Sequence, residues 1–272
     1  MDSTIPNTLE PLKLRGAIQS VDRAARILKA LAIGPRRMGV SELADRLQMS
    51  RPTVHGLLQT LQAHGFVEQD TASDRYQLGP GLVQLGNSYL DLSELRGRSI
   101  VHAQRLADRT GAAVRVGIIH GRSVLVVHHV FSPERTFQVL EVGALLPLHA
   151  SALGKAMLAF APRGFVADLT SEPLEKLTSR TLSVSSLREQ LGQVRDRGVA
   201  RERDEAVLGE SSLASPIFDH TGLAVGAIGV VGETEVIMPR GPAKGITAAV
   251  IEAARGTSRD LGALRWPAPL AT

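Results

Sequence analysis

The stretch VSELADRLQMSRPTVHGLLQTLQAHGFVEQD, residues 40–70, decides the fold of the first third of the chain. Twice in it, apolar residues recur at the i, i+3, i+4, i+7 spacing of one helix face, at Val40, Leu43, Ala44 and Leu47 and at Val54, Leu57, Leu58 and Leu61. The first helix is expected to start at Ser41. In the second helix, Pro52 suits the first position, and Ser50 or Arg51 is expected near the N-cap. Because about three to four residues separate them, the stretch predicts a helix-turn-helix.

The flanking residues complete a small domain. Upstream, Ser20 is expected to cap a helix that Gly34-Pro35 stops. Downstream, 66–69 and 76–78 have the composition of two short strands around a polar turn. Three helices followed by a hairpin predict a winged helix-turn-helix over 20–80, preceded by a flexible tail over 1–19. Any small three-helix bundle would show such stripes, and some winged domains bind only protein.

The rest of the chain predicts a mixed α+β domain. Residues 81–98 carry apolar side chains at three- and four-residue spacing, which predicts a linker helix whose apolar side can pair with a second copy. A domain over 99–264 follows, with an antiparallel sheet. Its strands are expected at 114–118, 124–128, 137–142, 199–203, 213–218 and 223–231, and its helices at 99–111, 151–160, 186–196 and 243–264.

Composition limits the function classes. The chain has 272 residues, of which 43% are hydrophobic and 21% charged, as in an ordinary globular protein. It has no cysteine, which excludes a disulfide framework, a thiolate zinc site and a cysteine nucleophile. The net charge of +4 suits an anionic partner without requiring one. With no secretory signal and no apolar run near the roughly 20 residues of a membrane helix, a soluble cytoplasmic protein is expected.

Five segments in this order resemble the IclR family of bacterial transcription regulators. They are SVDRAARILKAL at 20–31, SELADRLQMSRPTVHGLLQTLQAHGFVEQD at 41–70, RYQLGPGLVQLG at 75–86, PLHASALGKAMLAF at 147–160 and LASPIFDHTGLAVGAIGVVG at 213–232. The resemblance implies a winged helix-turn-helix, a linker helix and an effector-binding domain of profilin-like, GAF-related type. It also implies a homodimer or homotetramer on palindromic operator DNA, and no cofactor.

In such a domain the start of the second helix meets the DNA. The apolar stripe leaves the DNA-facing candidates Arg51, Pro52, His55, Gly56 and Gln59 pointing outward. Arg51 is expected at a guanine or a phosphate and Gln59 at an adenine. The hydroxyls of Ser50 and Thr53 lie where phosphates bind, and Arg75 on the wing is a further phosphate or minor-groove candidate. A solvated surface position is the alternative for each. Gly56 departs from the family, which usually has a basic or longer residue there, and suggests close approach to the DNA backbone.

The resemblance also implies an effector pocket against the sheet, closed by the segment HASALGKA. That segment holds Ser151, Gly154 and Lys155, although a solvated lysine is the alternative for Lys155. The remaining candidates are the family's polar pocket positions and three apolar residues for which core packing is the alternative: Glu202, Ser212, Gly229, Val231, Phe137, Leu140 and Leu148. Because Gly229 and Val231 lack polar side chains, a bulkier metabolite such as an aromatic acid is favoured over a very small polar acid.

Catalytic and metal motifs are incomplete. Gly154-Lys155 lacks the rest of a phosphate-binding loop, and 209–213 lacks the last glycine of a nucleophile elbow. The histidines form no HExxH pair, so no metal is expected. Glu202, Asp204 and Glu205 are expected at an exposed strand end, interleaved with arginines. Two hypotheses remain: a ligand-responsive DNA-binding regulator of a catabolic operon, and a small-molecule-binding or catalytic α+β protein whose winged domain only mediates assembly.

Overall fold

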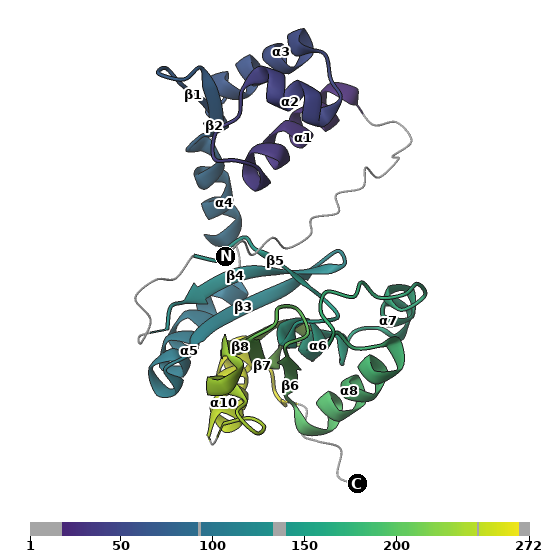
Figure 1. Ribbon diagram of the computed structural model, residues 1–272. Coiled ribbons are helices and arrows are strands. Elements are labelled where there is room, and N and C mark those ends of the chain that lie inside the picture. The colour runs from purple at the N-terminus through teal and green to yellow at the C-terminus, as the bar shows by residue number, and fades with distance from the viewer. Residues whose placement is uncertain (1–17, 92–93, 133–139, 244, 267–272) are drawn as a thin grey trace. The chain divides into compact units, whose positions relative to one another are not determined.

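The computed structural model describes residues 18–91, 94–132, 140–243 and 245–266 (Figure 1). The chain divides into two compact units, Met1–Tyr89 and Leu90–Thr272. None of the helices in the described ranges combines the length and the apolar character that a membrane crossing requires.

The first unit is a winged helix-turn-helix. It consists of α1 Gln19–Ile33, α2 Val40–Leu47, α3 Arg51–Ala63 and the antiparallel strands β1 Val67–Asp70 and β2 Arg75–Leu78. The predicted apolar stripes form its core, where Ile27, Leu43 and Leu58 are fully buried. The side chain of Ser50 caps α3 by accepting a hydrogen bond from the backbone N–H of Thr53.

Two predicted helix starts came too late in the sequence, by two residues for α1 and by one residue for α2. Helix α1 begins at Gln19 after Ile18, so Ser20 lies inside the helix and does not cap it. Helix α2 begins at Val40, because the carboxylate of Glu42 accepts a hydrogen bond from the Gly39 N–H at 2.9 Å and closes the first turn one residue earlier.

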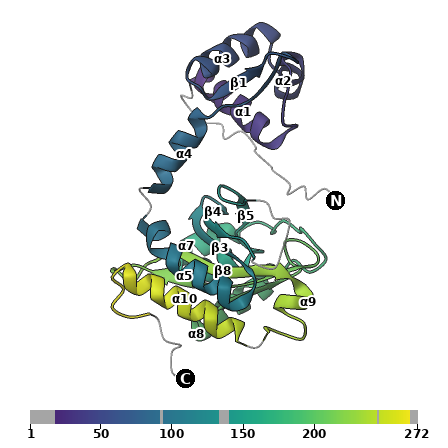
Figure 2. The same cartoon turned by 90° about the vertical axis from the view of Figure 1, so that its left-hand side faces the viewer.

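The second unit is built on a six-stranded antiparallel sheet of order β5-β4-β3-β8-β7-β6. Its strands are β3 Ala113–His120, β4 Ser123–Val130, β5 Leu145–Pro147, β6 Ala200–Arg203, β7 Glu210–Phe218 and β8 Ala224–Glu233. Helices α5 Glu94–Thr110 and α10 Ile246–Asp260 lie side by side on one face (Figure 2). The short helix α6 Ala152–Leu158 packs on the other face, with α8 Val184–Arg197 against it. Each face therefore has its own apolar core.

Helix α4, Gly81–Asp91, connects the units in the chain, and the predicted linker helix over 81–98 was too long. Helix α5 already begins at Glu94, five residues before the predicted start at 99. The reason is Leu95, which is buried in the core of the second unit and so belongs to that unit's first helix.

Further differences concern short elements. Residues 140–142, the described part of the strand predicted at 137–142, form no strand, and the edge strand beside β4 is β5. The final helix ends at Asp260, short of the predicted 264. Helices α7 Arg163–Leu169 and α9 Thr234–Ile237 were not predicted.

Candidate functional site

The outward face of α3 carries the predicted DNA-binding residues of the helix. Arg51, Pro52, His55, Gly56 and Gln59 are all exposed, on the side of the helix opposite its buried leucines. At the helix start, the hydroxyls of Ser50 and Thr53 lie 2.7 Å apart. This helix end presents two hydroxyls and a guanidinium, which together suit a phosphate or a base edge.

Gly56 has open space where a side chain would begin. No atom outside its own helix turn lies within 4 Å of the position that a Cβ would take. Packing within the chain therefore does not require glycine here, although glycine costs about 1 kcal/mol relative to alanine inside a helix.

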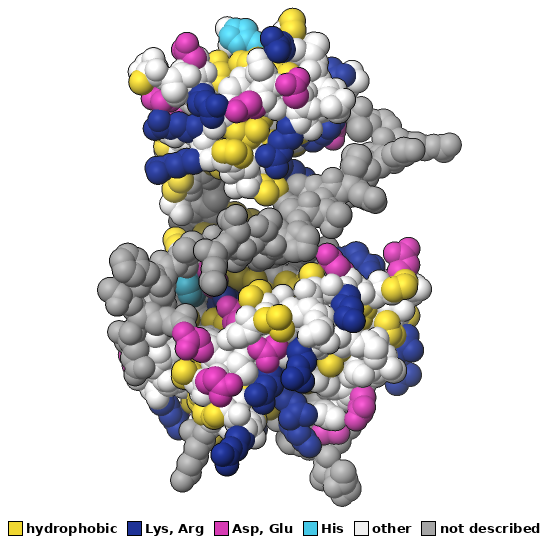
Figure 3. All heavy atoms as spheres, in the orientation of Figure 1, with side chains coloured by type: hydrophobic (Ala, Val, Ile, Leu, Met, Phe, Trp, Pro, Cys, Tyr) yellow, Lys and Arg dark blue, Asp and Glu magenta, His cyan; other side chains and the backbone are white. Residues whose placement is uncertain are grey.

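Arg75 is already engaged within the domain. Its guanidinium contacts a Glu42 carboxylate oxygen at 2.9 Å and the carbonyl oxygen of Arg37 at 3.0 Å. Arg37 in turn pairs with Asp70 at 2.7 Å. Basic and acidic side chains accordingly lie next to one another around the β1–β2 hairpin (Figure 3). Arg75 therefore anchors the wing to α2, while 43% of its side chain stays exposed.

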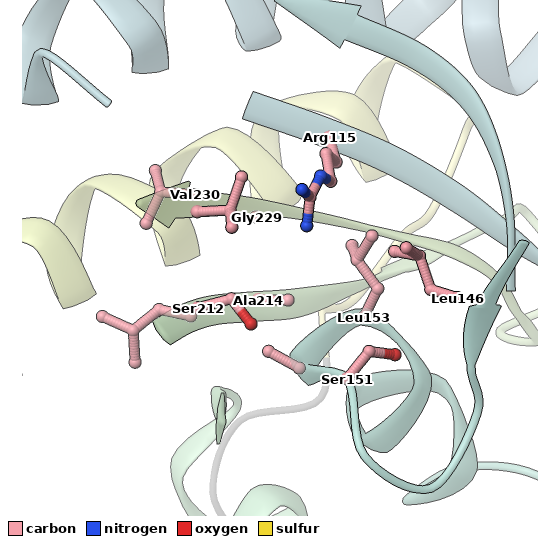
Figure 4. Close-up of a pocket in the computed structure, with 11 residues that line it drawn as sticks. Arg115, Leu146, Ser151, Leu153, Ser212, Ala214, Gly229 and Val230 are labelled. Carbon is pink, nitrogen blue, oxygen red and sulfur yellow. The ribbon is translucent and has the colours of Figure 1, made fainter. Parts of the chain in front are cut away.

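The second unit holds a small pocket between the sheet and α6 (Figure 4). It is lined by Arg115, Leu146, Ser151, Ala152, Leu153, Ser212, Leu213, Ala214, Gly229, Val230 and Val231. Its volume is about 20 Å³, room for roughly one water molecule. Since ligand pockets usually measure several hundred Å³, it must widen to admit a metabolite.

Two glycines allow the backbone to close around this pocket. A Cβ on Gly154 would lie 2.1 Å from the carbonyl oxygen of Leu148, and one on Gly229 would lie 2.3 Å from that of Leu213. Both distances are far inside van der Waals contact. Glycine is therefore required at both positions by close approach of backbone.

Arg115 is the pocket residue that sequence reasoning missed. It lies in the middle of β3, in register with Gly229 of β8. Its guanidinium contacts both carboxylate oxygens of Glu141 and reaches Glu210 at 3.2 Å. Burial alone would lower the pKa of Arg115, but Glu141 and Glu210 outweigh burial and raise it, so the charge is permanent. The expectation that the Gly229 side of the pocket is apolar was therefore wrong.

A second polar network lies behind the pocket. Lys155 is fully buried, and its ammonium contacts Glu205 at 2.6 Å and the Gln190 side-chain oxygen at 3.0 Å. Glu202 accepts hydrogen bonds from the Glu205 N–H at 2.7 Å and from the hydroxyl of Ser212 at 2.8 Å. Because Ser212 lines the pocket, this network contacts the pocket wall directly.

The prediction of an exposed strand end at 202–205 was wrong for its two glutamates. Glu202 and Glu205 are 2% and 4% exposed, and Lys155 supplies the counter-charge that allows their burial. Two carboxylates share one ammonium, however. Burial raises the pKa of Glu202 to about 7, against the opposing effect of its hydrogen bonds.

The pocket brings together only some of the predicted effector-binding residues. Ser151, Ser212, Gly229 and Val231 line it. Lys155 and Glu202 form the network behind it, and Leu148 and Gly154 pack against each other. Leu140 is 62% exposed and does not line the pocket, and Phe137 lies outside the described residues.

Comparison with known proteins covers both units. Residues 20–71 match the IclR helix-turn-helix domain, and residues 87–259 match the bacterial transcriptional regulator IclR C-terminal domain. The glycerol operon regulatory protein of Streptomyces griseus is 48% identical over 92% of this chain and 98% of its own. Its namesake in Streptomyces coelicolor is 45% identical, with the same coverage. A crystal structure of an IclR-type regulator from Alicyclobacillus acidocaldarius, 24% identical, superposes with a TM-score of 0.79 over 90% of this chain and 98% of that one.

These matches decide between the two hypotheses drawn from the sequence. They confirm the fold class, α+β with an N-terminal winged helix-turn-helix and an IclR-type C-terminal domain. They also favour a DNA-binding regulator over an enzyme, because the matched domains and the similar proteins are those of regulators. The chain belongs to the IclR family of bacterial transcription regulators.

Proposed function

We propose that this protein controls transcription of a glycerol catabolic operon in response to a glycerol-derived metabolite. The observation that carries the proposal is the identity of 48% and 45% with two glycerol operon regulatory proteins, each matched over 98% of its length. Likeness of that extent includes both the DNA-facing helix and the pocket-bearing unit. Because its target is chromosomal DNA, the protein acts in the cytoplasm.

Operator reading is assigned to the start of α3. Ser50 and Thr53 hold a phosphate at the helix N-terminus, and Arg51 contacts a guanine or a neighbouring phosphate. His55 and Gln59 follow one and two turns later on the same exposed side. Pro52 fixes the first turn, and Gly56 lets the DNA backbone approach the helix.

The pocket is assigned to the effector. Its small volume and its two serine hydroxyls, Ser151 and Ser212, favour a three-carbon polyol or a derivative of one. The aromatic acid favoured by the sequence would require the sheet and α6 to separate further. Ser212 also links a bound ligand to the buried Glu202.

Self-association is assigned to α4. Leu85 and Tyr89, four residues apart on one side of this helix, expose 56% and 53% of their surface in the single chain, and exposed apolar side chains that lie together mark an interaction site. Covering them against a second copy produces a homodimer, which two-fold symmetric operator DNA requires. A homotetramer then arises from pairing of dimers.

The proposal is tested with DNA upstream of glycerol-catabolic genes and an unrelated promoter fragment of equal length. We expect a shifted band only with the first. We also expect a glycerol-derived metabolite to change that shift and to raise the Tm of the protein, because a ligand that binds only the folded state stabilises it. Equal retardation of both fragments, or a Tm that responds to aromatic acids and to no glycerol derivative, contradicts the proposal.

A further inference from the structure

The pocket has a built-in binding position for a negative charge. Among its described lining residues, Arg115 is the one with a charged side chain. The side chain is 12% exposed, and its guanidinium points into the space between the sheet and α6 (Figure 4). Gly229 stands opposite Arg115 in register. The backbone of Arg115 is held in a central strand of the sheet, so the charged group starts from a fixed point in the pocket wall.

The present partners of Arg115 are less firmly held than Arg115 itself. The Glu141 side chain, which follows β4 outside any strand, is 27% exposed, and that of Glu210, at the first residue of β7, is 38% exposed. Glu141 occupies Nε and Nη2, the flat edge with which an arginine grips a carboxylate or a phosphate through two parallel hydrogen bonds. Glu141 therefore imitates the anionic group of a ligand.

An anion can enter only by exchange. With Glu141 and Glu210 both in place, the charge on Arg115 is more than cancelled, and a further anion would be repelled at a few ångströms. Release of Glu141 frees the two-donor edge and restores the attraction. Since Glu141 is partly exposed, water can solvate it after release.

The two serines supply complementary hydrogen bonds. Ser151 Oγ accepts from the Gly154 N–H at 3.1 Å, which leaves its hydroxyl hydrogen free to donate. Ser212 donates to Glu202, which leaves its oxygen free to accept. A ligand hydroxyl can therefore accept from the first serine or donate to the second.

We propose that the pocket binds a small hydroxylated anion whose phosphate or carboxylate displaces Glu141 from Arg115 while its hydroxyls bind Ser151 and Ser212. This inference rests on the proposed function and specifies the effector as an anionic derivative of the polyol. Binding detaches Glu141 from Arg115 on β3. The segment that carries Glu141 therefore loses this contact with the sheet when the pocket is occupied.

The test is calorimetric titration of the full chain with glycerol phosphate, glycerate and neutral glycerol. Glycerol phosphate and glycerate distinguish a phosphate from a carboxylate as the group that binds Arg115. We expect at least one anion to bind about tenfold or more tighter than glycerol, because a hydrogen-bonded charge pair contributes about that factor. Arg115→Gln should lose this preference, and Arg115→Lys, which keeps the charge but lacks the two-donor edge, should reduce it. The double variant Arg115→Gln, Glu141→Gln should lose the preference without leaving Glu141 as an unpaired carboxylate.

Whether Glu141→Gln raises or lowers anion affinity distinguishes displacement of Glu141 from simple attraction of the anion to Arg115. Glu141→Gln weakens the competing group, so anion affinity should rise roughly threefold. Glu210→Gln, which removes a single hydrogen bond, should raise it less. Glu252→Gln is the matched control, because it breaks the pair between Arg109 of α5 and Glu252 of α10, on the opposite face of the sheet, and should leave affinity unchanged.

Several results would overturn the proposal. They are absence of binding by both anions at millimolar concentration, glycerol binding as tightly as either anion, unchanged preference in folded Arg115→Lys, or weaker anion binding by Glu141→Gln. Operator binding without any ligand is measured on the same preparations. Its absence in the wild type would count against the proposed function alone, whereas a failed anion titration with operator binding intact would count against this inference alone.

Discussion

At the residue scale, Gly56 separates what the chain needs for folding from what it needs for DNA. A Cβ at this position meets open space, so alanine fits and should raise helix stability by up to about 1 kcal/mol. If the DNA backbone approaches α3 here, the added methyl group stands in its way. We predict that Gly56→Ala raises or preserves Tm and weakens operator binding, as measured by melting and gel shift on one preparation. Unchanged operator affinity would remove Gly56 from the DNA contact.

Glu202 gives the C-terminal unit a pH-dependent stability. Its pKa is raised to about 7 in the fold from 4.5. The folded chain therefore holds this proton more tightly than the unfolded chain. The stabilisation is full below about pH 4.5, falls as pH rises and is lost above about pH 7.

Glu202→Gln keeps the shape and removes the titration. Relative to the wild type, the variant should gain about 1–3 kcal/mol between pH 5 and pH 8. The check is the difference in Tm between variant and wild type at the two pH values. Glu189→Gln on the exposed side of α8 is the control. If the Tm difference between Glu202→Gln and the wild type changed with pH no more than that of the control, the raised pKa of Glu202 would be contradicted.

At the scale of elements, the loop before α6 depends on Gly154. A methyl group would press on the Leu148 carbonyl oxygen at 2.1 Å, and backbone cannot yield as a side chain can. We predict that Gly154→Ala destabilises the unit by about 1–3 kcal/mol despite the helix preference of alanine. Gly192→Ala in α8, whose Cβ would have ordinary contact at 3.9 Å, should be neutral or slightly stabilising. Equal Tm values for the two variants would disprove the close approach.

Helix α4 is predicted to be the element that pairs copies of the chain. Leu85→Asp places a charge among its exposed apolar side chains and should shift the protein towards monomer in light scattering. Asn87→Asp adds the same charge about 200° around the helix and should leave the assembly intact. Dissociation by both variants, or by neither, would contradict an interface specific to the apolar side.

Elements were predictable where their signal is local. Helices α2 and α3 carry their apolar stripe, cap and stop within a few residues, so their place and exposed faces followed from the sequence. The pocket did not, because Arg115 meets Glu141 and Glu210 from 26 and 95 residues away. The burial of Lys155 was not predictable either, because its partner Glu205 is 50 residues distant. One signal was available in the sequence. A charged residue, Arg115, stands between Val114 and Val116 in a strand whose two faces could both be covered by the predicted helices.

At the scale of the whole molecule, we propose complementary roles for the two units: α3 presents a helix start to DNA and the pocket beside α6 binds the metabolite. The central claim is that binding occurs through phosphates and base edges at α3. Such binding releases counterions and must weaken as salt rises. Arg51 provides the sharpest local test, because it is exposed, lies at the helix start and takes no part in the core.

The decisive measurement is operator affinity by fluorescence anisotropy across a range of salt, for the wild type, Arg51→Ala and the distant surface control Arg197→Ala. We predict a Kd that rises steeply with salt, a loss of about 1–3 kcal/mol for Arg51→Ala and none for Arg197→Ala. A Kd that is insensitive to salt, or equal for Arg51→Ala and the wild type, would contradict the assignment of α3 as the DNA-reading helix.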